Sequence, residues 1–105
     1  MIKLIQFGRE SCIPCKVMNI HISNKINENT NINFEYVNVD QIRSEDTYSE
    51  LLKVIVNQKK YKSLPLFSIV EDNENEISIG VIEIFHTTSY TEIDEILDKY
   101  FREEE

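Results

Sequence analysis

The sequence predicts a single α/β domain, residues 1–105, whose elements follow in the order strand, helix, strand, helix, strand, strand, helix. Three observations support this prediction. Short apolar runs rich in β-branched residues alternate with segments of helical spacing. A chain of 105 residues with 41% hydrophobic content can build one hydrophobic core. Every substantial apolar segment belongs to one of these elements, so we expect one domain.

The first strand and the first helix meet close to the first cysteine. The run Ile2–Phe7 has the length and the β-branched content of a strand. Pro14 is favoured in the first turn of a helix. Apolar residues then recur at every fourth position, which is helical spacing: Met18, Ile22 and Ile26. Cys12 is therefore predicted at a strand-to-helix junction.

The middle of the chain contains three further strands and one helix. Phe34–Asp40 alternates in polarity and is predicted to be a strand. Tyr48–Val56 has the pattern of a helix. Leu66–Val70 and Ile77–Ile84 are predicted to be strands, joined as a hairpin by the polar turn Glu71–Glu76.

The chain is predicted to close with an amphipathic helix over Tyr90–Phe101, capped by Ser89 or Thr91. Its apolar face is formed by Ile93, Ile96, Leu97 and Tyr100. The five tyrosines of the chain, including Tyr36, are interpreted as core and core-edge packing.

Cys12 and Cys15 are the two cysteines of the chain, and two residues separate them. The N-terminus of a helix presents unpaired N–H groups and the positive end of the helix dipole, both of which stabilise a thiolate. We therefore expect the pKa of Cys12 to lie below its ordinary value, with Lys16 favouring ionisation and Glu10 opposing it. A bridge across so short a loop removes little chain entropy, so a reactive dithiol is favoured over a structural disulfide.

The same cysteine spacing is also half of a zinc site, which would need two further ligands. The two histidines are His21 and His86. His21 lies six residues beyond Cys15, on a helix face about 120° away, and we expect it at the surface. We therefore predict no metal.

Two motifs carry a resemblance to a known family. Cys12-Ile13-Pro14-Cys15-Lys16 resembles the active-site motif of the thioredoxin family. Ser63-Leu64-Pro65-Leu66-Phe67 places an X-Pro bond before an apolar run, where these proteins keep a cis-proline opposite the dithiol. The resemblance covers nearly the whole chain. It implies the short thioredoxin-like fold, a four-stranded mixed sheet of order 2-1-3-4 with helices on both faces.

The resemblance also implies an activity, thiol-disulfide oxidoreduction on protein disulfides. Cys12 would be the nucleophile and Cys15 the resolving cysteine. The substrate-binding residues would be Ser11, Ile13, Pro14, Leu64 and Pro65. The implied partners are disulfide-bearing proteins and a thioredoxin reductase-type electron donor, with no bound cofactor beyond the redox-active Cys12–Cys15 disulfide.

The sequence departs from the thioredoxin pattern at two positions. Gln6 occupies the place of a buried aspartate that in many thioredoxins helps to deprotonate the second cysteine, and an amide cannot act as a base. Ser11 stands where a tryptophan commonly precedes the motif. These differences keep open a non-enzymatic binding module that uses the same groove.

A glutaredoxin-type, glutathione-dependent reductase is the other alternative within this fold. Glutaredoxins usually have proline directly after the first cysteine, where this chain has Ile13. Residues 84–88, predicted to form the turn after the last strand, contain no glycine pair of the kind that holds glutathione there. In that turn Phe85 and His86 would either narrow the partner groove or, in the case of Phe85, pack inward.

The net charge of −8, from 19 acidic and 11 basic residues, predicts repulsion of nucleic acid and of anionic lipid. The sequence shows neither a positively charged leader with an apolar core nor an apolar stretch approaching the roughly 18–20 residues of a membrane span. We therefore expect a cytoplasmic monomer that binds neither nucleic acid nor membrane.

Overall fold

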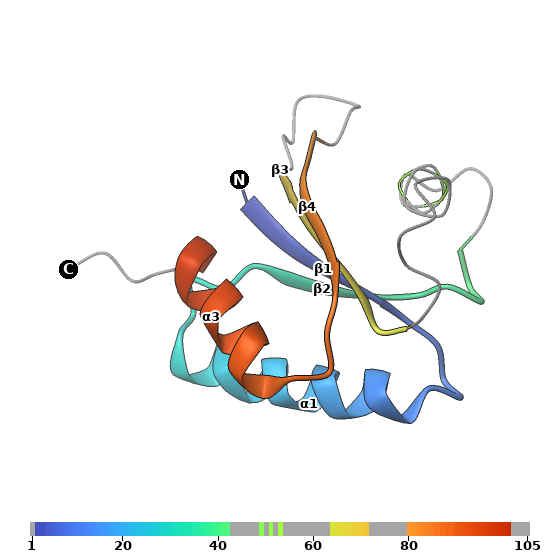
Figure 1. The fold of residues 1–105 in the computed structure, drawn as a ribbon, viewed down its shortest axis with the longest axis horizontal. Helices are drawn as coiled ribbons and strands as arrows, with labels where there is room; N and C mark the ends of the chain where they lie inside the picture. Colours follow the sequence, from blue (N-terminus) through green and yellow to red (C-terminus); the bar gives the residue numbers. More distant parts are fainter. Residues whose placement is uncertain are drawn as a thin grey trace.

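The structure is a computed structural model that describes residues 2–42, 64–71 and 80–101 together with Ser49, Leu51 and Lys53. Within these residues the chain forms four strands and two longer helices (Figure 1). In chain order they are β1 (Ile2–Gly8), α1 (Ile13–Glu28), β2 (Phe34–Asn38), β3 (Leu66–Glu71), β4 (Gly80–His86) and α3 (Tyr90–Phe101).

The four strands form one mixed sheet in the order β2-β1-β3-β4. β1 pairs with β2 in parallel, whereas the β1–β3 and β3–β4 pairs are antiparallel. A parallel pair requires a crossover connection, and α1 supplies it between β1 and β2. The predicted mixed sheet and its strand order are confirmed.

All four strands end at other residues than the sequence predicts. β1 ends at Gly8 instead of Phe7, and β3 ends at Glu71 instead of Val70. β2 ends at Asn38 instead of Asp40 because the Asn38 side chain accepts the backbone N–H of Asp40 at 2.9 Å, which turns the chain. β4 continues to His86, beyond the predicted end at Ile84. Phe85 and His86 therefore belong to a strand and not to the following turn.

Parts of three predicted elements lie outside the described residues. In the predicted helix Tyr48–Val56, only Ser49, Leu51 and Lys53 are described, and these three are helical. Glu71, the first residue of the predicted turn, belongs to β3. Residues 72–79, which hold the rest of that turn and the first residues of the last strand, are not described.

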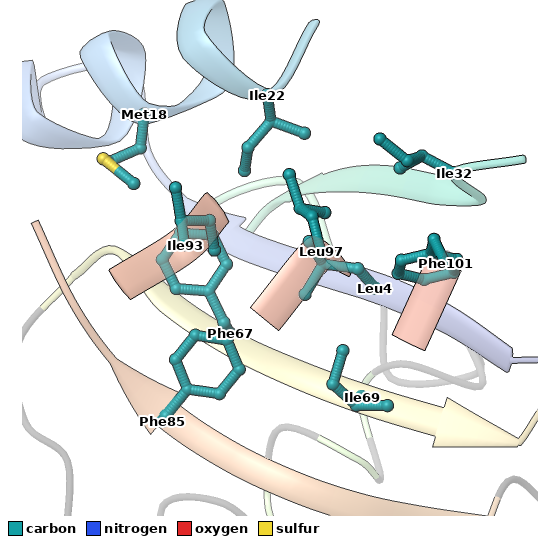
Figure 2. Packing of buried hydrophobic residues seen from close by; sticks show 10 residues of the cluster. All are labelled: Leu4, Met18, Ile22, Ile32, Phe67, Ile69, Phe85, Ile93, Leu97 and Phe101. Atoms are coloured by element: carbon teal, nitrogen blue, oxygen red, sulfur yellow. The ribbon is translucent and has the colours of Figure 1, made fainter. Parts of the chain in front are cut away.

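The larger hydrophobic cluster fills the space between one face of the sheet and the helices α1 and α3 (Figure 2). Alternation along β1 and β3 points every second side chain to this face, and the apolar stripes of both helices cover it. Its buried members are Leu4, Met18, Ile22, Ile32, Phe67, Ile69, Phe85, Ile93, Leu97 and Phe101.

A second cluster lies on the opposite face of the sheet. It consists of the intervening residues of the strands, together with Leu51: Ile5, Phe7, Val37, Leu51, Leu66 and Val70. Because side chains of a strand alternate between faces, Gln6 lies on the face of α1 and α3, between Ile5 and Phe7, which point the other way.

His21 of α1 contacts two residues of α3. Its Nε2 lies 2.7 Å from Oδ1 of Asp94, and its ring stacks on Tyr90 with centroids 4.2 Å apart. The His21 side chain is only 18% exposed. The prediction of a surface histidine was therefore wrong, because α3 covers this side of α1.

The start of α3 shows which residue caps it. The Ser89 hydroxyl accepts the backbone N–H of Glu92 at 3.3 Å, and the Ser89 carbonyl accepts that of Ile93 at 3.1 Å. Ser89 is therefore the N-cap, and Thr91 lies within the helix.

Candidate active site

Cys12 and Cys15 form a disulfide at the start of α1, with their Cα atoms 5.2 Å apart. Cys12 is the N-cap of the helix and has extended backbone angles, φ −91° and ψ 103°. Pro14 lies in the first turn, where its missing N–H leaves no hydrogen bond unmade. The dithiol therefore stands where the sequence predicts it, at the junction of β1 and α1.

The sulfur of Cys12 takes the place of a capping oxygen. The backbone N–H of Cys15 donates to Cys12 Sγ at 3.1 Å. The first turn of α1 contains no acidic residue, so no carboxylate opposes negative charge from within that turn. A thiolate at Cys12 would receive this N–H and the positive end of the helix dipole.

The two cysteines differ in access to solvent. Cys12 is partly exposed, whereas Cys15 is fully buried beneath the first turn of the helix. Cys12 is therefore the more accessible of the two cysteines.

The residues around Cys12 form an exposed rim. Ser11, Ile13 and Pro14 are all exposed, and the side chain of Ile13 is 72% exposed. An apolar side chain this open to water beside the disulfide offers apolar contact area at the surface.

Leu64 and Pro65 lie at the same end of the sheet as the dithiol. Phe7, near the end of β1, pairs with Leu66 at the start of β3, so the chain leaves β1 and enters β3 at the same end of the sheet (Figure 1). Leu64 is partly exposed, Pro65 is buried, and the peptide bond between them is cis.

His86 supports the Pro65 segment. Its Nδ1 lies 2.7 Å from the carbonyl oxygen of Pro65. Because a carbonyl can only accept a hydrogen bond, Nδ1 carries the proton and donates it. Phe85, by contrast, is buried and stacks on Phe67 with centroids 5.2 Å apart, so it packs inward and does not narrow a groove.

Gln6 lies beneath the dithiol and is fully buried. Its Nε2 donates to the carbonyl oxygen of Cys15 at 2.9 Å, which fixes the first turn of α1 to β1. Its Oε1 has no hydrogen-bond partner among the described residues. Gln6 therefore holds the backbone of Cys15 and leaves one free acceptor in the core.

Gly8 and Tyr36 complete the surroundings of Cys15. A Cβ added to Gly8 would lie 2.9 Å from Cζ of Tyr36 and 3.0 Å from Cβ of Cys15, and it would also meet the Tyr36 hydroxyl. The phenol and the Cys15 side chain thus both lie against Gly8, with no room for a methyl group between them and the backbone. Burial raises the pKa of the Tyr36 phenol above its ordinary value of 10.0.

Gly8→Ala should destabilise the protein because the new methyl group collides with Tyr36 and with Cys15. Overpacking of this kind costs about 1–3 kcal/mol. Gly80→Ala is the matched control, since its Cβ would meet Cβ of Glu71 at 3.9 Å, an ordinary contact. Surface changes of that type stay within about 0.5 kcal/mol. Urea unfolding of both variants tests this, and equal losses would contradict the assigned packing.

Sequence reasoning missed Gly8, and it interpreted Tyr36 as core or core-edge packing without placing it beside Cys15. The signal that identifies them is strand register: Gln6 pairs with Tyr36 and Gly8 with Asn38 in the parallel pair β1–β2. Residues paired in register project to the same face, so an expected Gln6 beneath the dithiol implies Tyr36 beside it.

Metal-binding and membrane-spanning features are absent from the part of the chain that the structure describes. No three side chains of His, Cys, Asp or Glu come together there as a ligand set. Neither of its two longer helices has the length and apolar character that a membrane crossing demands.

No protein-family model matches this sequence, and no curated protein matches it either. Solved structures do match. Thioredoxin from Trichomonas vaginalis is 19% identical, with a TM-score of 0.65 over 94% of this chain and 78% of that one. Thioredoxin from Fasciola hepatica is 16% identical, with a TM-score of 0.66 over 94% and 80%. Oxidised mitochondrial thioredoxin 3 from Saccharomyces cerevisiae is 18% identical, with a TM-score of 0.63 over 93% and 77%.

These likenesses define the fold of the chain as thioredoxin-like. The fold, together with a Cys-x-x-Cys disulfide at the start of α1, is consistent with redox chemistry on thiols. The site needs no bound cofactor for such chemistry, because the reversible bond lies between two of its own side chains.

Proposed function

We propose that this protein is a thiol-disulfide oxidoreductase that reduces disulfides in protein substrates. The observation that carries the proposal is the asymmetry of the dithiol. Cys12 is partly exposed and accepts an N–H at a helix N-terminus, whereas Cys15 is buried within bonding distance behind it. The first environment suits a nucleophile, and the second holds the resolving thiol within reach of the Cys12 sulfur.

The reaction proceeds in two exchanges. The Cys12 thiolate attacks one sulfur of the substrate disulfide, which forms a Cys12–substrate disulfide and releases the other sulfur as a thiolate. Cys15 then loses its proton and attacks Cys12 Sγ. This step forms the Cys12–Cys15 disulfide and releases the second substrate sulfur, which takes up a proton. Two electrons have then passed from the dithiol to the substrate.

The substrate is held by the rim around Cys12. Ile13 provides exposed apolar surface, and Ser11 and Pro14 flank it. The backbone of Leu64, held by the buried Pro65, pairs with the extended substrate chain. His86 fixes that segment through the Pro65 carbonyl.

Another turnover requires two electrons for the Cys12–Cys15 disulfide. We assign their delivery to a thioredoxin reductase-type donor. A reducing compartment, the cytoplasm, favours electron flow in this direction. We further propose that the protein acts as a monomer, since one chain supplies every residue of the proposed site.

Reduction of insulin by dithiothreitol tests this function. With the protein present, we expect the reduced insulin to precipitate earlier than with dithiothreitol alone. Equal onset would contradict catalysis and favour a binding module. A parallel assay with glutathione and glutathione reductase should show no acceleration, whereas acceleration would indicate a glutaredoxin-type reductase.

A further inference from the structure

Cys15 presents a chemical problem that the proposed function leaves unsolved. It must become a thiolate to attack Cys12 Sγ, yet it is fully buried, and burial disfavours the charged form of a thiol. A hydrogen-bond donor directed at the Cys15 sulfur would offset this effect.

Gln6 makes no hydrogen bond to that sulfur. One N–H of its Nε2 donates to the Cys15 carbonyl at 2.9 Å. Its Oε1, which has no hydrogen-bond partner among the described residues, only accepts hydrogen bonds and would repel a thiolate. A second side chain beside Cys15 is therefore the better candidate for the donor.

Tyr36 is in position to supply it. Gln6 and Tyr36 are paired in register, so both project from the sheet toward α1. The Tyr36 phenol and the Cβ of Cys15 both lie against Gly8, and they are the groups that a Cβ at that position would meet first. Among the described residues, no hydrogen bond engages the Tyr36 hydroxyl.

We propose that the Tyr36 hydroxyl donates a hydrogen bond to the sulfur of Cys15 when that sulfur is a thiolate, in the mixed disulfide with substrate. This proposal rests on the proposed function and adds a residue that assists its second step, the attack of Cys15 on Cys12 Sγ. The proton that leaves Cys15 passes to solvent. Tyr36 keeps its own proton, because burial holds the pKa of its phenol above 10.0.

Other ionisable groups lie on the elements around the dithiol. On the described residues they are Glu10 between β1 and α1, Lys16 of α1, the ion pair between Arg9 and Asp40 in the segments after β1 and β2, and His86 of β4. Substitution of Tyr36 leaves all the others unchanged, so it isolates the contribution of one hydroxyl.

The test follows the reaction of the reduced protein with the chromogenic disulfide dithiobis(nitrobenzoate) by stopped flow. Attack by Cys12 releases the first thionitrobenzoate, and resolution by Cys15 releases the second. In Tyr36→Phe the first release should keep its wild-type rate, whereas the second should slow about tenfold at pH 7, as expected for loss of a hydrogen bond to a charged group.

The pH profile distinguishes this role from a structural one. Without the hydroxyl the pKa of Cys15 rises, so the second release in Tyr36→Phe should recover as the pH is raised. Tyr100→Phe is the matched control, because the Tyr100 hydroxyl donates to Glu83 at 2.6 Å and Tyr100 belongs to the last turn of α3. That end of α3 lies far from the start of α1 (Figure 1). Tyr100→Phe should leave both releases unchanged.

A second measurement uses an intact Tyr36. In Cys12→Ser, the nuclear magnetic resonance signal of Tyr36 Cζ should shift with the same pKa as the ultraviolet absorbance of the Cys15 thiolate. Three results would each overturn the proposal. They are a second release in Tyr36→Phe at the wild-type rate, a slow second release in Tyr36→Phe that persists at high pH, and a Tyr36 Cζ signal that does not change when Cys15 ionises. Absence of the first release in the wild-type protein would instead contradict the proposed function.

Discussion

Cys12→Ser should reduce insulin no faster than dithiothreitol alone. A hydroxyl at this position is not ionised at neutral pH and forms no disulfide, so the first exchange cannot occur. The remaining helix contacts should survive, because a serine oxygen can accept the Cys15 N–H that now reaches Cys12 Sγ at 3.1 Å. Unfolding by urea therefore serves as the control that the variant is folded.

Cys15→Ser should have the complementary effect. Attack by Cys12 still occurs, but the mixed disulfide is no longer resolved from within and accumulates. Mass spectrometry of Cys15→Ser mixed with a disulfide-bearing protein should detect the covalent adduct. The variant that carries both Cys12→Ser and Cys15→Ser should form no adduct. Two results would contradict the assignment of the two cysteines. One is turnover by Cys12→Ser, and the other is a covalent adduct that Cys12→Ser forms with the substrate through Cys15.

Phe67→Ala should lower the free energy of unfolding by about 3–5 kcal/mol, the usual cost of removing a buried aromatic ring. Phe67 is fully buried in β3 and stacks on Phe85. It also pairs with Gln6, so its loss affects the strand that holds the dithiol. A domain of this size is stable by about 5–15 kcal/mol, and the variant should be close to unfolding.

Ile82→Ala is the comparison for this effect. Ile82 is also a large apolar residue in the sheet, but its side chain is 48% exposed. We expect a loss below about 1 kcal/mol. Denaturant titrations of both variants measure the difference, and similar losses would show that Phe67 is not central to the core.

Most of the fold follows from local patterns in the sequence. Tyr90–Phe101 was predicted with its observed bounds because its apolar residues and Ser89 define the helix locally. The end of β4 was missed because pairing decides it: Phe85 and His86 are held by Phe67 and Leu66 of the neighbouring strand. Polarity along the chain carries no information about that pairing.

The candidate site divides in the same way. The placement of Cys12 and Cys15 at the start of α1 follows from the adjoining strand and helix patterns. The contacts of His21 cannot be predicted from local patterns, because its partner Asp94 lies 73 positions away in sequence. Gln6 was identified as an unusual residue, but its bond to the Cys15 carbonyl depends on how α1 crosses over β1.

Alkylation of the reduced protein with iodoacetamide, followed by peptide mapping across a range of pH, tests the central claim most directly. Cys12 should react first, with an apparent pKa below the ordinary value of about 8.5, because the start of α1 stabilises its thiolate. Cys15 should stay unmodified over the same time, because it is buried. Equal labelling of both cysteines, or an ordinary pKa at Cys12, would contradict a primed nucleophile at this position.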